Sequence, residues 1–166
     1  MKIATTLTVN GNAYPVELDP GTSLLAAVRD VIGLTGSKEG CDDSECGACM
    51  MLLDGQPVNA CSYLALQAEG SEITTVEGLA DEATLAPLQA AFLELGGVQC
   101  GFCTPGMLVS ATALLAGNPA PTEDEVRIGL SGNLCRCTGY DGIVKAVLSV
   151  ARRSLNVHVD SDDRHI

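Results

Sequence analysis

The most informative stretch of the chain reads Gln99-Cys100-Gly101-Phe102-Cys103, and it is completed by Cys135-Arg136-Cys137. The four thiols form two close pairs, and we expect each pair to precede a helix. Paired cysteines supply the soft thiolate donors that metal clusters need. A helix N-terminus also stabilises the negative charge of such a cluster. On spacing alone, a pair of zinc knuckles would also fit.

An earlier group of cysteines reads Cys41-x4-Cys46-x2-Cys49 and is closed by Cys61. This is the spacing of plant-type [2Fe–2S] sites. Small neighbouring residues would let backbone N–H groups approach a cluster; these are Gly40, Gly47 and Ala48. Zinc is the alternative, although its sites usually combine two tighter pairs. Together the two groups use all eight cysteines.

Composition limits the possible functions. The 166 residues carry a formal net charge of −12, which disfavours binding to nucleic acid or to an anionic membrane. No secretory signal is expected from the N-terminal residues, and the longest apolar run is too short to span a bilayer. Eight cysteines without a signal favour metal ligation over disulfides, in a reducing, cytoplasmic compartment.

The first half of the chain predicts a compact α+β unit. Alternating apolar residues predict strands on both sides of Asn10-Gly11, with Pro15 on an edge strand. A helix is expected over 22–32 from its apolar spacing. The three-cysteine loop spans 37–49. A second hairpin turns at Asp54-Gly55 and brings Cys61 back toward that loop, and a last strand covers 73–76.

The second half predicts helices. Residues 77–84 are interpreted as a linker. Helical spacing then covers 85–95 with Leu85, Leu88, Phe92 and Leu95 on one face, and further helices are expected from Thr104-Pro105, from the capping box at 122–125, and from 141 onward. The domains are therefore predicted as 1–78 and 79–155, followed by a polar tail over 156–166 that we expect to be mobile.

Four motifs resemble the small iron–sulfur subunit of the molybdenum hydroxylases, the xanthine oxidase family, which includes carbon monoxide dehydrogenase and bacterial N-heterocycle hydroxylases. The similarity extends over about residues 3–153. The motifs are Gly40-Cys41, Glu45-Cys46-Gly47-Ala48-Cys49, Gln99 to Gly106 (QCGFCTPG) and Gly132 to Tyr140 (GNLCRCTGY).

The resemblance implies a fold and two ligand sets. The fold would be α+β, with an N-terminal plant-type ferredoxin-like (β-grasp) domain followed by an all-α four-helix [2Fe–2S]-binding domain. Cys41, Cys46, Cys49 and Cys61 would hold the cluster nearer a flavin. Cys100, Cys103, Cys135 and Cys137 would hold the cluster nearer the molybdenum cofactor. Gln99 and Cys137 would also contact the pterin part of that cofactor.

The resemblance also implies a role in a larger enzyme. The chain would relay electrons from a molybdopterin centre on a large subunit to FAD on a medium subunit, in a dimer of heterotrimers acting on an N-heteroaromatic substrate. No residue of the chain would be catalytic. Two alternatives stay open: a free-standing acidic ferredoxin-type carrier, whose charge would steer it to basic partners, and a zinc-stabilised interaction module.

Overall fold

The computed structural model describes residues 1–80 and 85–162, with side chains described up to residue 153. In the described part, five strands form one mixed sheet in the order β2-β1-β5-β3-β4. β1 runs antiparallel to β2 and parallel to β5, and β3 runs antiparallel to both β4 and β5. The strands are β1 (Ile3–Val9), β2 (Asn12–Leu18), β3 (Met50–Leu53), β4 (Gln56–Asn59) and β5 (Glu72–Thr74).

Both predicted hairpins are confirmed, and their turns explain the residues found there. Asn10 and Gly11 have φ of 51° and 74°, and Asp54 and Gly55 have φ of 49° and 80°. Two consecutive positive φ angles match the right-handed twist of the flanking strands, and Asn-Gly and Asp-Gly adopt them readily. Pro15 lies in β2, at the edge of the sheet as expected.

A helical segment covers one face of the sheet. It begins as α1 (Leu24–Ala26), capped by Ser23, and continues as the π-helical turn η1 (Ala27–Ile32). The helix predicted over 22–32 is therefore found in place, but only its first turn is α-helical. Gly33 ends it with φ of 92°. Buried apolar side chains from sheet and helix form the first core, which includes Leu7, Val9, Leu24, Leu25, Val28, Met51 and Ile73.

The second half of the described chain is helical, so the prediction of a sheet unit followed by a helical unit is confirmed. A second core lies between the helices and includes Leu88, Phe92, Met107, Val126, Ile143 and Val147. The helices are α2 (Pro87–Glu94), α3 (Thr104–Gly117), α4 (Glu123–Gly129) and α5 (Asp141–Asp162). No helix within residues 1–80 and 85–162 combines the length and apolar character needed to cross a bilayer.

Three details differ from expectation or fall outside the described residues. Leu85 and Leu95 are 58% and 40% exposed, because α2 begins only at Pro87 and ends at Glu94. The predicted linker begins with the short helix η3 (Val76–Leu79), whose end residues pack on the second core, whereas residues 81–84 are not described. The backbone of α5 continues to Asp162. The tail expected over 156–166 has no described side chains, and 163–166 lie outside the described residues.

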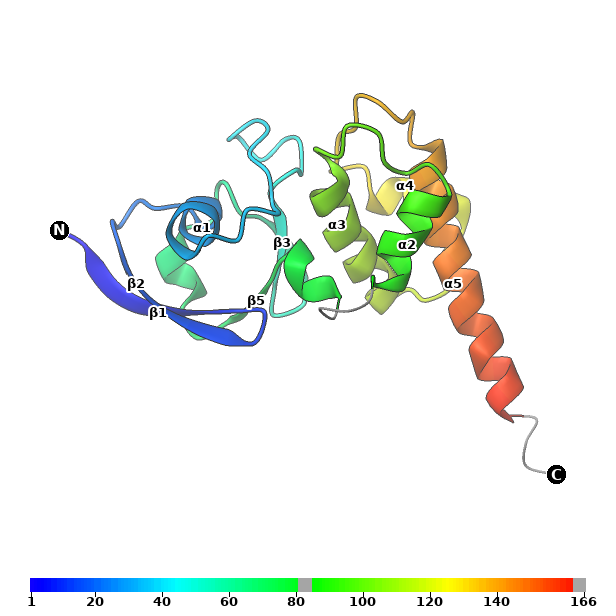
Figure 1. Ribbon diagram of the computed structural model, residues 1–166, viewed down its shortest axis with the longest axis horizontal. Helices are drawn as coiled ribbons and strands as arrows, with labels where there is room; N and C mark the ends of the chain where they lie inside the picture. Colours follow the sequence, from blue (N-terminus) through cyan, green and yellow to red (C-terminus); the bar gives the residue numbers. More distant parts are fainter. Residues whose placement is uncertain (81–84, 163–166) are drawn as a thin grey trace.

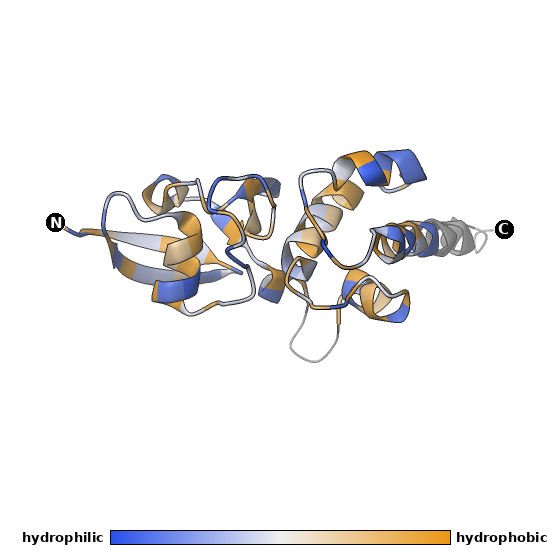
Figure 2. Ribbon diagram, turned by 90° about the horizontal axis from the view of Figure 1, so that it is seen from above, coloured by the Kyte–Doolittle hydropathy of each residue, from blue (hydrophilic) through white to orange (hydrophobic). Residues whose placement is uncertain are grey.

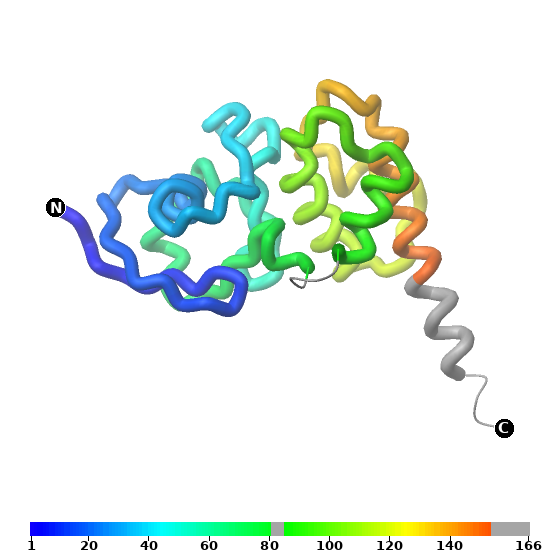
Figure 3. Tube along the Cα trace, viewed as in Figure 1, coloured from blue at the N-terminus to red at the C-terminus, as the bar shows by residue number. Residues whose placement is uncertain are grey.

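The two halves pack side by side, with β3 next to α3 (Figure 1). Met50 and Leu52 of β3 contact Val109 of α3 in a third, smaller apolar cluster. Seen from above, the halves follow one another along the long axis, and hydrophobic residues occur in each (Figure 2). The cysteine loop of the sheet half and the loops that precede α3 and α5 lie on the same side, at the top of the view (Figure 3).

Candidate metal centres

The first group of cysteines is assembled from one loop and one hairpin. Cys41, Cys46 and Cys49 lie on the loop before β3, and Cys61 follows β4. Cys49 and Cys61 are buried, whereas Cys41 and Cys46 are half-buried. The Cys46 thiol is hydrogen-bonded with Cys41 and the Cys49 thiol with Cys61, and Cys46 also interacts electrostatically with both Cys49 and Cys61. The β3–β4 hairpin therefore returns the distant fourth cysteine to the loop, as predicted from the sequence.

The loop folds tightly around these thiols. A Cβ at Gly40 would lie 2.8 Å from the Cys46 sulfur, so this position accepts only glycine without displacement. Asp42 and Ser44 adopt left-handed conformations, with φ of 61° and 67°. The Asn59 side chain donates to the Ser44 carbonyl over 3.0 Å, which holds the loop against the hairpin.

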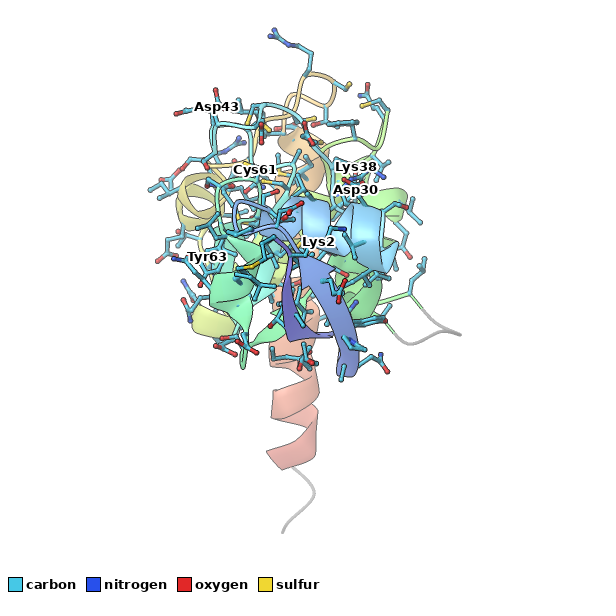
Figure 4. All side chains as sticks on the ribbon, turned by 90° about the vertical axis from the view of Figure 1, so that its left-hand side faces the viewer. Lys2, Asp30, Lys38, Asp43, Cys61 and Tyr63 are labelled. Atoms are coloured by element: carbon cyan, nitrogen blue, oxygen red, sulfur yellow. The ribbon has the colours of Figure 1, made fainter. Side chains whose placement is uncertain are left out.

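The environment of the first group is asymmetric. Burial raises the pKa of the Cys49 thiol to about 11. The Ser44 hydroxyl lies 3.8 Å from the Cys61 sulfur and is also bonded to the Ser62 hydroxyl. In Figure 4, Asp43 lies at the outer edge of the loop, while Cys61 lies further inside. The group thus has a buried side toward the sheet and an acidic side toward solvent.

The second group joins the two loops that precede α3 and α5. The sulfur atoms of Cys100 and Cys137 are 3.5 Å apart, and Cys103 interacts with Cys135. Two sulfurs bound to one tetrahedral metal at about 2.3 Å are roughly 3.8 Å apart. The separation of the Cys100 and Cys137 sulfurs is therefore close to that of two thiolates on one metal ion. The expected cap Thr104 is the first residue of α3, and Cys103 itself is the N-cap.

The two pairs of the second group differ in exposure. Cys100 and Cys137 are exposed, whereas Cys103 and Cys135 are half-buried. Burial raises the pKa of the Cys103 thiol to about 12. Burial also acts to raise the pKa of Cys135, but hydrogen bonds from the Thr138 hydroxyl and backbone, the Cys137 backbone and the Cys103 thiol together outweigh it and lower that pKa to about 7. Gln99, the other predicted contact residue, is exposed beside Cys100.

A short network surrounds Cys135, and the sequence offered no assignment for its members. Thr138 places its hydroxyl 3.1 Å and its backbone nitrogen 3.5 Å from the Cys135 sulfur. The Cys135 backbone N–H donates to the Tyr140 hydroxyl over 2.9 Å. Both residues belong to the stretch Gly132 to Tyr140 quoted above, so their spacing from Cys135 was the available signal.

The two groups are connected directly through the backbone. The Leu134 N–H donates to the Cys46 carbonyl over 2.9 Å. The buried Asn133 side chain donates to the Gly47 carbonyl over 3.0 Å. Between the loops lies an open hollow of about 650 Å³, lined by residues that include Gly40, Cys46, Phe102 and Cys135. Each of the two hydrogen bonds therefore joins the loop that carries the first cysteine group to a loop that carries the second.

The donor set fits two-iron clusters. Thiol–thiol hydrogen bonds join four pairs, Cys41/Cys46, Cys49/Cys61, Cys100/Cys137 and Cys103/Cys135, and the two pairs of each group also interact electrostatically. A [2Fe–2S] core takes two thiolates on each iron, four per cluster. Two groups of two pairs match that requirement.

Comparison with known proteins agrees with this donor set. Residues 7–86 match the 2Fe-2S iron-sulfur cluster binding domain family, and residues 75–148 match the [2Fe-2S] binding domain family. The chain is 48% identical over 155 residues to the nicotinate dehydrogenase small FeS subunit of Eubacterium barkeri, covering 93% of this chain and 99% of that protein.

Solved structures give the same result. A chain of quinoline 2-oxidoreductase from Pseudomonas putida 86 superposes with a TM-score of 0.86 at 48% identity, covering 92% of this chain and 97% of that one. The aldehyde oxidoreductase of Desulfovibrio desulfuricans gives a TM-score of 0.88 at 42% identity, although this chain spans only 17% of it.

The fold, the paired cysteines and these matches define a protein with two [2Fe–2S]-binding domains. The chain belongs to the small iron–sulfur subunits of the molybdenum hydroxylase, or xanthine oxidase, family. It is accordingly a subunit of an oxidoreductase.

Proposed function

We propose that the chain relays electrons from a molybdopterin centre on a large subunit to FAD on a medium subunit. Bound [2Fe–2S] clusters supply reversible one-electron transfer. The contribution of this chain is to hold two such clusters at a fixed separation and to set their potentials through burial, hydrogen bonding and charge. The paired thiols on both sides of the bonded backbone connection carry this proposal.

The ligand sets follow the pairs. Cys41, Cys46, Cys49 and Cys61 hold the first cluster, and Cys100, Cys103, Cys135 and Cys137 hold the second. We place the domain boundary between residues 78 and 79, with a polar tail over 156–166. The two family matches, 7–86 and 75–148, overlap around this boundary and support it.

The backbone connection offers a route between the clusters. From Cys46, the route follows the chain to its carbonyl oxygen and crosses the 2.9 Å hydrogen bond to the Leu134 N–H. One further peptide unit leads to Cys135. The route therefore consists of covalent bonds and one hydrogen bond, and it links a ligand of each cluster without crossing a gap.

The second cluster faces the molybdenum cofactor in this proposal. Cys100 and Cys137 are exposed, and Gln99 beside them is exposed as well. Gln99 and Cys137 thus remain accessible to a pterin held by the large subunit. On the other side, the first cluster lies behind an acidic loop formed by Glu39, Asp42, Asp43 and Glu45, which would face the medium subunit.

We further propose an N-heteroaromatic substrate, a dimer of heterotrimers and a cytoplasmic location. The names of two relatives, nicotinate dehydrogenase and quinoline 2-oxidoreductase, support the substrate class. The use of eight cysteines as thiolates supports a reducing compartment.

The decisive experiment is metal analysis of the complex purified from its native host. We expect about four irons per chain, as two [2Fe–2S] clusters require, together with about one molybdenum and co-purifying FAD. Four irons with neither molybdenum nor partner subunits would favour a free-standing carrier instead. Zinc in place of iron would refute both ligand sets.

A further inference from the structure

We propose that Thr138 raises the reduction potential of the second cluster by donating a hydrogen bond from its hydroxyl group to the Cys135 sulfur. This inference deepens the proposed function and rests on it, because it takes Cys135 as an iron ligand. Thr138 is itself no ligand. It acts through Cys135, as a residue that tunes the cluster potential.

The contact is short. The Thr138 Oγ1 lies 3.1 Å from the Cys135 sulfur, and the Thr138 backbone N–H reaches the same sulfur over 3.5 Å. Both residues are half-buried, so water competes only partly for these bonds. One sulfur atom therefore accepts two hydrogen bonds from a single residue.

The direction of the hydroxyl bond follows from its other partner. The Tyr140 backbone N–H donates to Thr138 Oγ1 over 3.1 Å. This bond occupies a lone pair of the hydroxyl oxygen and leaves its proton free to point elsewhere. A thiolate bound to iron carries no proton and can only accept. The Thr138 hydroxyl is therefore the donor and the Cys135 sulfur the acceptor.

The surrounding turn keeps Thr138 in this position. Gly139 and Tyr140 adopt left-handed conformations, with φ of 65° and 70°; for a tyrosine this conformation costs roughly 1–2 kcal/mol. The turn is secured because the Tyr140 hydroxyl accepts from the Cys135 N–H over 2.9 Å. The hydrogen bonds from Cys135 N–H to the Tyr140 hydroxyl, from Tyr140 N–H to Thr138 Oγ1 and from the Thr138 hydroxyl to the Cys135 sulfur thus close a ring that includes the sulfur.

The sign of the effect follows from charge. Reduction adds one electron to the cluster, and part of the added negative charge resides on the sulfurs. A hydrogen bond to a charged acceptor strengthens as that charge grows, so the Thr138 hydroxyl stabilises the reduced form more than the oxidised form. Hydrogen bonds to sulfur are among the factors that set cluster potentials. Removing this bond should lower the potential.

The first cluster provides an internal reference. Its nearest comparable contact, from the Ser44 hydroxyl to the Cys61 sulfur, is 3.8 Å long and is shared with Ser62. The hydroxyl bond at the second cluster is much shorter. A short hydroxyl contact of this kind is thus found at the second group and not at the described thiols of the first, so a change at Thr138 should affect only one cluster.

The test is a redox titration of the purified complex, with the EPR signal of each reduced cluster followed separately. Thr138→Val removes the hydroxyl and preserves the branched shape, whereas Thr138→Ser keeps a hydroxyl. We expect Thr138→Val to reduce the equilibrium constant for reduction of the second cluster roughly tenfold, a shift of about 59 mV for one electron. Thr138→Ser should stay close to the wild type, and the first cluster should be unchanged in both variants.

Several outcomes would overturn the inference. An unchanged potential in a fully loaded Thr138→Val variant would do so and would leave the proposed function intact, as would equal shifts of both clusters. If Thr138→Val fails to load iron, Thr138→Ala replaces it with the same expectation. If Thr138→Val and Thr138→Ala both lose the second cluster while Thr138→Ser keeps it, the hydroxyl would be needed for cluster assembly and not for setting the potential. A wild-type complex without a second [2Fe–2S] signal would refute the proposed function itself.

Discussion

The Leu134 backbone N–H donates a hydrogen bond to the carbonyl oxygen of Cys46 over 2.9 Å. Leu134 precedes a cysteine of the second group, and Cys46 belongs to the first. One main-chain bond therefore connects two sites that are far apart in sequence. Single substitutions beside this bond should therefore change the stability of the chain or the properties of its clusters.

Gly106 should not tolerate a side chain. A Cβ added there would collide with the carbonyl oxygen of Gly47, and overpacking typically costs about 1–3 kcal/mol. We expect Gly106→Ala to lower the free energy of unfolding by about that amount, measured by urea denaturation. Gly117→Ala is a matched control at the end of the same helix, because nothing lies within 4 Å of its added Cβ. Because Gly117 is the last residue of the helix, that control should stabilise by less than about 1 kcal/mol, and equal losses in the two variants would contradict the proposed contact.

Asn133 should contribute more than an ordinary surface asparagine. Its side chain is 3% exposed and donates to the Gly47 carbonyl. Asn133→Ala should therefore cost about 0.5–1.5 kcal/mol, the usual contribution of one hydrogen bond, because the Gly47 carbonyl then keeps only the Met50 N–H at 3.2 Å. It should also weaken the magnetic coupling between the two reduced clusters in low-temperature EPR spectra. Asn12→Ala removes a similar but exposed bond to Asn10 and should stay within about 0.5 kcal/mol. Intact coupling in Asn133→Ala would exclude Asn133 from positioning the clusters.

Cys137→Ser should remove one cluster and leave the other. Iron should fall from about four to about two atoms per chain, because each [2Fe–2S] cluster depends on four thiolates. The EPR signal of the first cluster should persist, while electrons from molybdenum no longer reach FAD. Cys61→Ser should give the reverse pattern. Loss of all iron in either variant would mean that the two sites do not assemble independently.

Gln99→Ala should leave both clusters intact and weaken retention of the pterin cofactor. Gln99 is exposed beside Cys100, so its loss creates no cavity and the chain should remain equally stable. The measurement is molybdenum and iron content per complex after gel filtration. Unchanged molybdenum occupancy and activity would remove Gln99 from the cofactor site.

Glu125 should make the stability of α4 depend on pH. The Thr122 backbone N–H donates to its carboxylate over 2.7 Å, and this bond holds the pKa of Glu125 below its usual value. A carboxyl with a lowered folded-state pKa contributes stability above its unfolded pKa, and this contribution is lost as the pH falls through the folded pKa. Glu125→Gln should therefore be less stable than the wild type at neutral pH, and the two should converge in acid. Asp124→Asn removes the same charge one residue away and controls for net charge; a difference that persists in acid would contradict the mechanism.

Sequence patterns predicted the two hairpins and the grouping of the cysteines. The hairpins at Asn10-Gly11 and Asp54-Gly55 were predictable because turn geometry depends on the turn residues themselves. Sequence separation likewise grouped the eight cysteines into two sets. Local patterns failed at the ends of α2, where Leu85 and Leu95 continue the apolar spacing beyond the helix, and in the π-helical turn after α1.

The cysteine spacing by itself predicted two thiolate-bound metal centres and left iron–sulfur clusters and zinc as alternatives, because thiolate number and separation limit which metal centres can bind. Only the tertiary structure decided how the thiols pair, which neighbours reach their sulfurs and how the two sites are joined. Asn133 and Gly47 are separated by 86 positions, and no local pattern relates them. Only packing between the two halves can bring such distant residues together, and that packing also buries Met50 and Leu52 of β3 against Val109 of α3.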